Sequence, residues 1–236
     1  DSGFPLGWSQ AGMARGWRHR ATDSLSLACK LRAGALSHGL APRESLIVQS
    51  ESLAAVVLRG PVQLGVRIFA YGRRMIGTLD EAVRRYPNDP ELWYMLGDAR
   101  FHAGVFAGLS SRTSLEAFDR AIALDSAFTP SYVHAIPLSL EYSGTDAGRR
   151  YGTRFLQAGG MGSYAKSTSL VLDLLNPRTR GAAFAFLADS ADEHMFQMVW
   201  VAISRWLDDD ETALAVMRAR VAAEQDRKST RLNSSH

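Results

Sequence analysis

Apolar residues recur at helical spacing along almost the whole chain. Strand-like alternation bounded by hairpin turn signals is missing from the sequence. The clearest apolar stripe repeats at intervals of three and four residues and consists of Leu115, Phe118, Ala121, Ile122 and Leu124. This pattern predicts an all-α protein.

Helix start and stop signals separate these periodic segments. Asp89 is suited to cap a helix N-terminus, and Pro90 suits the first helical position, where its missing N–H has no cost. The next helix is predicted over residues 91–102 and ends at Gly104, because glycine favours helix termination. A loop rich in glycine and serine follows at Val105–Arg112.

Two short motifs recur in the order expected of paired helices. Trp93-Tyr-Met-Leu96-Gly97 opens one helix, and Ala121-Ile-Ala-Leu124-Asp125 closes the next. Together they resemble the signature of the tetratricopeptide repeat family, whose repeat of about 34 residues is one helix pair. The spacing between the two motifs is longer than in a standard repeat, and the Val105–Arg112 loop is where the additional residues fit.

This resemblance implies a right-handed α-solenoid of helix-turn-helix repeats. Residues 1–225 are interpreted as one array, with the clearest repeats at about 68–158. In such a repeat Trp93 and Leu96 fill the space between the two helices, and Gly97 lets them approach closely. A kink is expected at Pro137, inside a predicted helix. The signature positions are Trp8, Gly12, Ala82, Pro87, Trp93, Leu96, Gly97, Phe118, Ala121, Leu124 and Tyr132.

The two ends of the chain look unlike native protein. The last eleven residues, 226–236, match a translated sequencing adapter and are expected to be a disordered, non-native tail. The chain starts with Asp1, and truncation at both ends is expected. The formal charge is +3, but without the tail 24 basic residues face 23 acidic ones. Because the basic residues are also scattered, we expect no nucleic-acid partner.

The cysteine and the histidines lack the neighbouring residues that a metal site or a catalytic site needs. Cys29 is the only cysteine, which excludes an intrachain disulfide and a cysteine metal cluster, so it is interpreted as a small buried hydrophobe. His102, His134 and His194 are not followed by a second ligand three or four residues later. We therefore expect no metal, no cofactor and no catalytic residue.

Two further patterns have ordinary structural explanations. The segment Gly159-Gly160-Met161-Gly162 lacks the preceding strand and the motif of a phosphate-binding loop, so it is interpreted as a connection between helices. The arginine pairs at 73–74, 84–85 and 149–150 are interpreted as solvated helix faces.

Tetratricopeptide arrays bind partners in a groove lined by the first helix of each pair. Ser9, Met13 and Trp17 are expected to line this groove upstream. Tyr94 and Asp98 replace the Lys, Asn and Arg pattern that holds a C-terminal carboxylate, so a basic or apolar segment is the expected ligand. The alternative is that flanking helices fill the groove. The groove positions carried over from the family are Glu91, Tyr94, Asp98, Phe101, His102, Leu140 and Glu141.

Three functions are compatible with these features. The first is a protein-binding scaffold or sensor arm of a larger bacterial signalling protein, such as a serine/threonine kinase. The second is a stand-alone adaptor, and the third is an α-helical enzyme with an unrecognised site. The partner is expected to be a protein or peptide, and no membrane contact is expected because the sequence lacks a long apolar run. The abundant Arg, Ala and Gly favour a bacterial origin, and both cytoplasm and periplasm are compatible with the composition.

Overall fold

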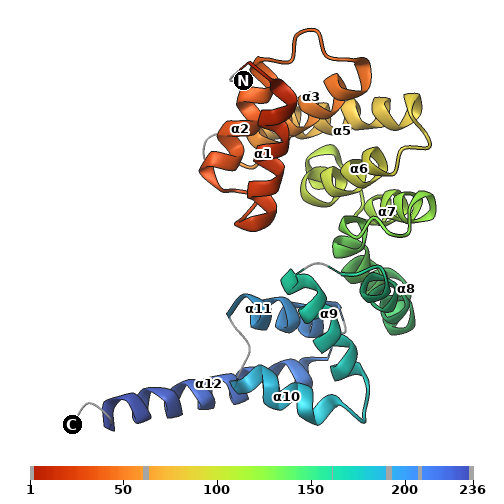
Figure 1. Cartoon of the computed structure of the whole chain (residues 1–236). Helices are drawn as coiled ribbons and strands as arrows, with labels where there is room; N and C mark the ends of the chain where they lie inside the picture. Colours follow the sequence, from red (N-terminus) through yellow and green to blue (C-terminus); the bar gives the residue numbers. More distant parts are fainter. Residues whose placement is uncertain (1–2, 61–63, 161, 190–192, 207–208, 234–236) are drawn as a thin grey trace. The chain divides into compact units, whose positions relative to one another are not determined.

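The protein is helical throughout the part of the chain that the structure describes. The computed structural model describes residues 3–60, 64–160, 162–189, 193–206 and 209–233. Within these ranges there is no β-strand, which confirms the all-α prediction (Figure 1).

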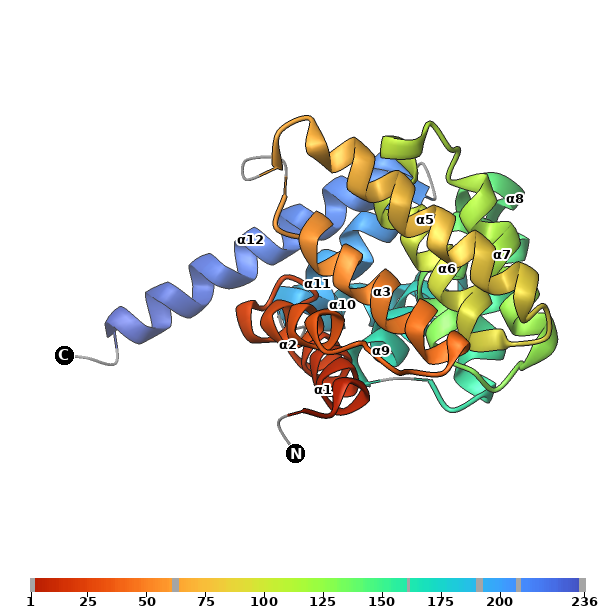
Figure 2. The same cartoon turned by 90° about the horizontal axis from the view of Figure 1, so that it is seen from above.

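The chain divides into two compact units, residues 1–131 and 132–236, which are described separately. Figures 1 and 2 show the helices of each unit from two sides. Unit 1 contains α1 (Pro5–Arg18), α2 (Ser24–Ala35), α3 (Pro42–Val57), α5 (Arg67–Arg85), α6 (Pro90–Ala103), the short 3-10 helix η1 (Gly104–Ala107) and α7 (Arg112–Leu124).

Each helix of unit 1 packs mainly against its neighbours in sequence. Contacts run from α1 to α2, α2 to α3, α3 to α5, α5 to α6 and α6 to α7. Helices α5 and α6 run antiparallel. Arg100 of α6 donates to Asp80 late in α5, whereas Phe106, which follows α6, lies over Gly72 early in α5. This order of packing is what stacked helix pairs require.

The boundaries of α6 follow the predicted signals. The Asp89 carboxylate accepts hydrogen bonds from the backbone N–H groups of Glu91 (3.0 Å) and Leu92 (3.3 Å). Pro90 occupies the first helical position, and Gly104 ends the helix. The predicted loop that follows forms η1, and it turns at Gly108, whose φ of 71° suits glycine.

Helices α6 and α7 approach each other closely at Gly97. A Cβ atom on Gly97 would lie 2.7 Å from two ring carbons of Phe118. Phe118 and Ala121 are fully buried, and Leu96 is 1% exposed. Glycine at position 97 therefore allows the close approach that the sequence predicts, with the Phe118 ring lying directly against the α6 backbone.

Trp93 does not fill the space between the two helices, contrary to what the repeat resemblance implies. Its side chain is only partly buried, and its indole N–H donates to the Pro87 carbonyl oxygen at 2.9 Å. Leu92, which is fully buried, takes the interior position instead. Trp93 thus covers the turn before α6 rather than filling the space between α6 and α7.

The other signature positions have mixed environments. Ala82 is fully buried, and Tyr132 of unit 2 is 1% exposed. Gly12 is buried where Lys30 and Cys29 of α2 cross α1. Three signature positions are more exposed, with partly buried side chains at Trp8 and Leu124 and an exposed one at Pro87.

Unit 2 has its own apolar core. Its helices are α8 (Pro130–Gln157, which starts two residues before the unit boundary), α9 (Gly162–Leu175), α10 (Arg180–Asp189), α11 (Glu193–Val201), the π-helical turn η2 (Ala202–Trp206) and α12 (Asp210–Asn233). Side chains from all the helices after α8 meet in this core, including Leu174, Leu187, Val199, Ile203 and Val216.

The interruption of α8 lies at Gly144 and not at the predicted position, Pro137. Gly144 has φ 78° and ψ −179°, whereas Pro137 lies within helical backbone. Glycine adopts this positive φ without a steric penalty, so the chain turns there. The segment at 159–162 connects α8 to α9, in agreement with the prediction, and Gly159, Gly160 and Gly162 all have positive φ.

The prediction of a disordered tail from residue 226 is wrong for most of that segment. Helix α12 continues to Asn233, and residues 234–236 lie outside the described part. No glycine or proline occurs between Asp210 and Asn233, so nothing in the sequence stops the helix.

The packing of α6 against α7 can be tested by truncating one side chain at a time. We expect Phe118→Ala to reduce the free energy of unfolding by about 3–5 kcal/mol, because it empties a fully buried site. Trp93→Ala should cost roughly half of that or less, because much of the indole remains in solvent. Urea denaturation of both variants measures the difference, and an equal loss would contradict the described environment of Trp93.

Candidate partner-binding surface

The first helices of the successive pairs, α1, α3 and α6, meet on one side of unit 1. Helix α1 contacts α3, and α3 contacts α6, although a second helix separates each pair in sequence. We call this surface the α1/α3/α6 face. It is the surface on which the sequence places most of its candidate binding residues.

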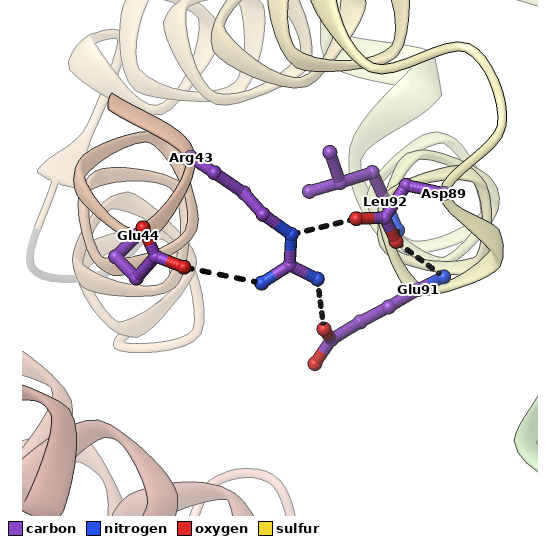
Figure 3. A network of polar contacts seen from close by, with 5 residues as sticks. All are labelled: Arg43, Glu44, Asp89, Glu91 and Leu92. Carbon is purple, nitrogen blue, oxygen red and sulfur yellow. Dashed lines mark hydrogen bonds and ion pairs between the residues drawn. The ribbon is translucent and has the colours of Figure 1, made fainter. Parts of the chain in front are cut away.

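Arg43 at the start of α3 joins this helix to the start of α6 (Figure 3). Its Nε donates to Asp89 Oδ2 and one terminal nitrogen donates to Glu91 Oε2, both at 2.6 Å. The other terminal nitrogen lies 3.6 Å from Glu44 Oε1. The hydrogen bond to Asp89 and the pairing with Glu91 raise the pKa of Arg43, and together they outweigh the opposite effect of partial burial. The guanidinium thus holds together three carboxylates from two helices.

A buried carboxylate lies between α1 and α3. Glu51 of α3 is 4% exposed and accepts a hydrogen bond from the hydroxyl of Ser9 on α1. Burial raises the pKa of Glu51, and the nearby charge of Glu91 acts in the same direction, against the opposing effects of Lys30 and Ser9. The charge of Glu91 therefore affects the ionisation of Glu51 across the face.

Three predicted groove residues lie near the end of α6. Phe101 is partly buried and His102 is exposed, with their rings in an edge-to-face arrangement at 5.0 Å. His102 Nε2 lies 3.5 Å from Asp98 Oδ1. Partial desolvation of the imidazole lowers the pKa of His102, but the hydrogen bond and charge of Asp98 outweigh this effect, so the pKa is raised. Asp98 precedes His102 by four residues, so the pair is not visible in the residues that follow the histidine.

Tyr94 does not present its ring to solvent. The side chain is 7% exposed and packs against Phe118 (ring centroids 6.2 Å apart) and Phe128 (5.5 Å). The expectation that Tyr94 is an aromatic anchor for a ligand is therefore wrong for this structure. The ring instead fills the space between α6 and the segment that follows α7.

The upstream candidates differ in accessibility. Ser9 is 1% exposed and occupied with Glu51, Met13 is partly buried, and Trp17 is 40% exposed. In unit 2, Leu140 is buried and lies against Gly148 across the turn at Gly144, whereas Glu141 is exposed. Because these two residues belong to the other unit, their contribution to the same groove stays a prediction.

Carboxylates outnumber cations on the α1/α3/α6 face. Helices α1, α3 and α6, together with Asp89, carry five carboxylates, namely Glu44, Glu51, Asp89, Glu91 and Asp98, and four arginines, namely Arg15, Arg18, Arg43 and Arg100. Three of these arginines are paired with carboxylates, Arg15 with Asp23, Arg43 with Asp89 and Glu91, and Arg100 with Asp80. Phe101 and Trp17 add partly accessible aromatic surface. Such a surface favours cationic and apolar ligands over anionic ones.

The remaining candidates from the sequence lie elsewhere. The arginine pairs at 73–74, 84–85 and 149–150 are exposed, as predicted. Cys29 is a free thiol that is partly buried rather than fully buried. His194 lies on α11, but its side chain is outside the described part. Among the described helices, none is both long enough and apolar enough to cross a bilayer.

Comparisons with known proteins give no relative whose site could be set beside these features. No protein-family model, curated protein or solved structure matches the chain.

The Arg43 bridge should contribute measurably to stability. We expect Arg43→Met to lower the free energy of unfolding by about 1 kcal/mol, since it leaves Asp89 and Glu91 without their shared cation at a partly exposed site. Arg43→Lys should restore only part of this, because an ammonium group cannot donate to both carboxylates in the same fork. Chemical denaturation compares the three proteins. Full rescue by lysine would show that charge alone matters.

Glu51 should give a pH dependence of its own. Its pKa is higher in the folded than in the unfolded state, so the folded state binds more protons and is destabilised as the pH rises above the unfolded value. Glu51→Gln keeps an acceptor for the Ser9 hydroxyl and cannot ionise. The stability of Glu51→Gln relative to the unsubstituted protein should therefore increase between acidic and neutral pH. A difference that does not change with pH in urea denaturation would contradict this.

Proposed function

We propose that this chain is a tetratricopeptide-type repeat array that binds a protein or peptide segment through the α1/α3/α6 face. The supporting observation is that Glu51, Glu91 and Asp98 lie on adjoining helices of that face, with the Phe101 ring packed against His102, the partner of Asp98. A segment with lysine or arginine next to a large apolar residue has the complementary chemistry. The chain itself carries out no catalysis in this proposal and contacts neither nucleic acid nor a membrane.

The site on this face differs from the groove expected from the sequence alone. Tyr94 is part of the packing, so the aromatic contribution comes from Phe101 and Trp17. Glu91 is engaged by Arg43, which leaves Asp98, paired with the titratable His102, as the carboxylate best placed to exchange partners. A basic ligand would compete with His102 for Asp98.

In the cell, this binding fits a docking or sensor arm of a larger bacterial signalling protein. The second candidate is a stand-alone adaptor, in which the same face assembles other proteins. The gene sequence on both sides of this segment distinguishes the two, because an adjoining kinase or DNA-binding domain is expected only for the first.

Binding to the face can be measured with a short fluorescent peptide that carries lysines and arginines around one tryptophan. We expect Asp98→Lys to weaken its binding about tenfold or more. Phe101→Ser should also weaken it, through loss of apolar contact. Fluorescence anisotropy gives the dissociation constants, with an otherwise identical peptide containing glutamates as the negative probe.

Glu116→Lys is the matched control for Asp98→Lys. Glu116 is exposed on α7, outside the α1/α3/α6 face, and the substitution changes the net charge by the same amount. We expect it to change binding by less than about twofold. Equal losses in the two variants would mean that only the overall charge of the protein attracts the peptide, and the proposal would be wrong.

A further inference from the structure

A second surface lies at the end of unit 1 where α3 leads into α5 and α6 leads into α7. Three large apolar side chains there are unusually exposed, Val66 at 83%, Val105 at 73% and Phe69 at 46%. Val66 directly precedes α5, Phe69 lies in its first turn, and Val105 belongs to η1. An exposed apolar cluster of this kind commonly marks an interaction site.

Ring packing against α5 holds Phe69 and Phe106 in place. The rings of Phe69 and Phe106 meet edge to face, with centroids 5.6 Å apart. Phe106 in turn lies on the α5 backbone at Gly72, where a Cβ atom would be 3.1 Å from the Phe106 Cβ. The insertion between α6 and α7 thus extends the apolar surface of α5 through a close ring contact.

The two chain segments that form this end contain arginines and no carboxylate side chain. No aspartate or glutamate occurs between Glu51 and Asp80 or between Asp98 and Glu116, the two segments that form this end. Exposed arginines occur in both segments, at Arg59, Arg67, Arg73, Arg74 and Arg112. Val66, Phe69 and Arg73 recur at intervals of three and four residues, which places them along one side of α5. Apolar and cationic groups are therefore adjacent.

We propose that this surface, made of Val66, Phe69, Arg73, Val105 and Phe106 with Arg67 beside it, docks an acidic segment of a partner protein. The segment carries at least one large apolar side chain that packs against Phe69 and Val105. Its carboxylates pair with the guanidinium groups of Arg67 and Arg73, which accept carboxylates in a bidentate geometry. This ligand has the opposite charge to the one proposed for the α1/α3/α6 face, so one array holds two different segments.

A protein segment fits this surface better than a bilayer does. The phenylalanine pair is held at a defined angle on Gly72, and the arginines follow the apolar residues along one helix, so a ligand is recognised in one direction and register. Attraction to an anionic bilayer depends on the number of nearby cations and needs no such register.

The test uses a short fluorescent peptide with glutamates and aspartates around one phenylalanine or leucine. We expect it to bind the unsubstituted protein and to bind Arg67→Glu/Arg73→Glu at least about tenfold more weakly. The matched control is Arg84→Glu/Arg85→Glu, which makes the same charge change at the opposite end of the same helix. This control should alter the affinity by less than about twofold, once thermal denaturation has shown both proteins to be folded.

The apolar part is tested by Val66→Ser/Phe69→Ser, with Phe4→Ser as a control at another exposed aromatic residue. The first should weaken binding of the acidic peptide by about tenfold, and the second should leave it unchanged. Asp98→Lys should not weaken this peptide, and Arg67→Glu/Arg73→Glu should not weaken the basic peptide, so that failure of either surface is seen independently of the other.

Three results would overturn the proposal. The first is that the acidic peptide does not bind the unsubstituted protein. The second is an equal loss of affinity in Arg67→Glu/Arg73→Glu and Arg84→Glu/Arg85→Glu. The third is sedimentation with phosphatidylcholine vesicles containing about one third phosphatidylserine that depends on Val66, Phe69 and the two arginines while peptide binding does not. That last result would identify an anionic membrane surface as the ligand.

Discussion

The bridge that Arg43 makes between α3 and α6 fixes the surface on which the proposed function depends. Helix α5 lies between these two helices in sequence, so packing of sequence neighbours alone places α3 and α6 only indirectly. Arg43 connects them directly, and it does so through Asp89, which also caps α6. One carboxylate therefore sets both where α6 begins and how its first turn faces α3. Because the bridge uses Glu91 as well, it also decides which carboxylates are left for a ligand.

Local signals in the sequence predicted the helices well because each acts within a few residues. Asp89, Pro90 and Gly104 bound α6 as expected, and Gly97 meets Phe118 as close helix packing requires. Prediction failed where the outcome depends on competition between distant groups. The direction of a side chain that meets a distant segment, as Tyr94 meets Phe128, cannot be read from helical spacing. Likewise the break in α8 falls at Gly144, since the actual turn depends on the chain folding back so that Leu140 meets Gly148.

The candidate site was predictable in its location but only partly in its composition. The resemblance to the repeat family implied that Glu91, Asp98, Phe101 and His102 line a groove, and the structure has Asp98 and His102 in contact. The buried Glu51 was not anticipated, although it stands out as a carboxylate within an apolar run of α3. Its partners come from α1 and α2, far away in sequence, so no local pattern could reveal them.

The insertion between α6 and α7 gives the two proposed surfaces their separate chemistry. Residues 104–112 add η1 beside the start of α5, and this addition brings the Phe106 ring against Phe69. The carboxylates of α6 occur no later than Asp98, and the arginines of α5 near this end occur no later than Arg74. Carboxylates are thus concentrated on α6 and arginines at the start of α5. A scaffold with this arrangement can hold a basic and an acidic segment at once, because neither ligand would be attracted to the other's surface.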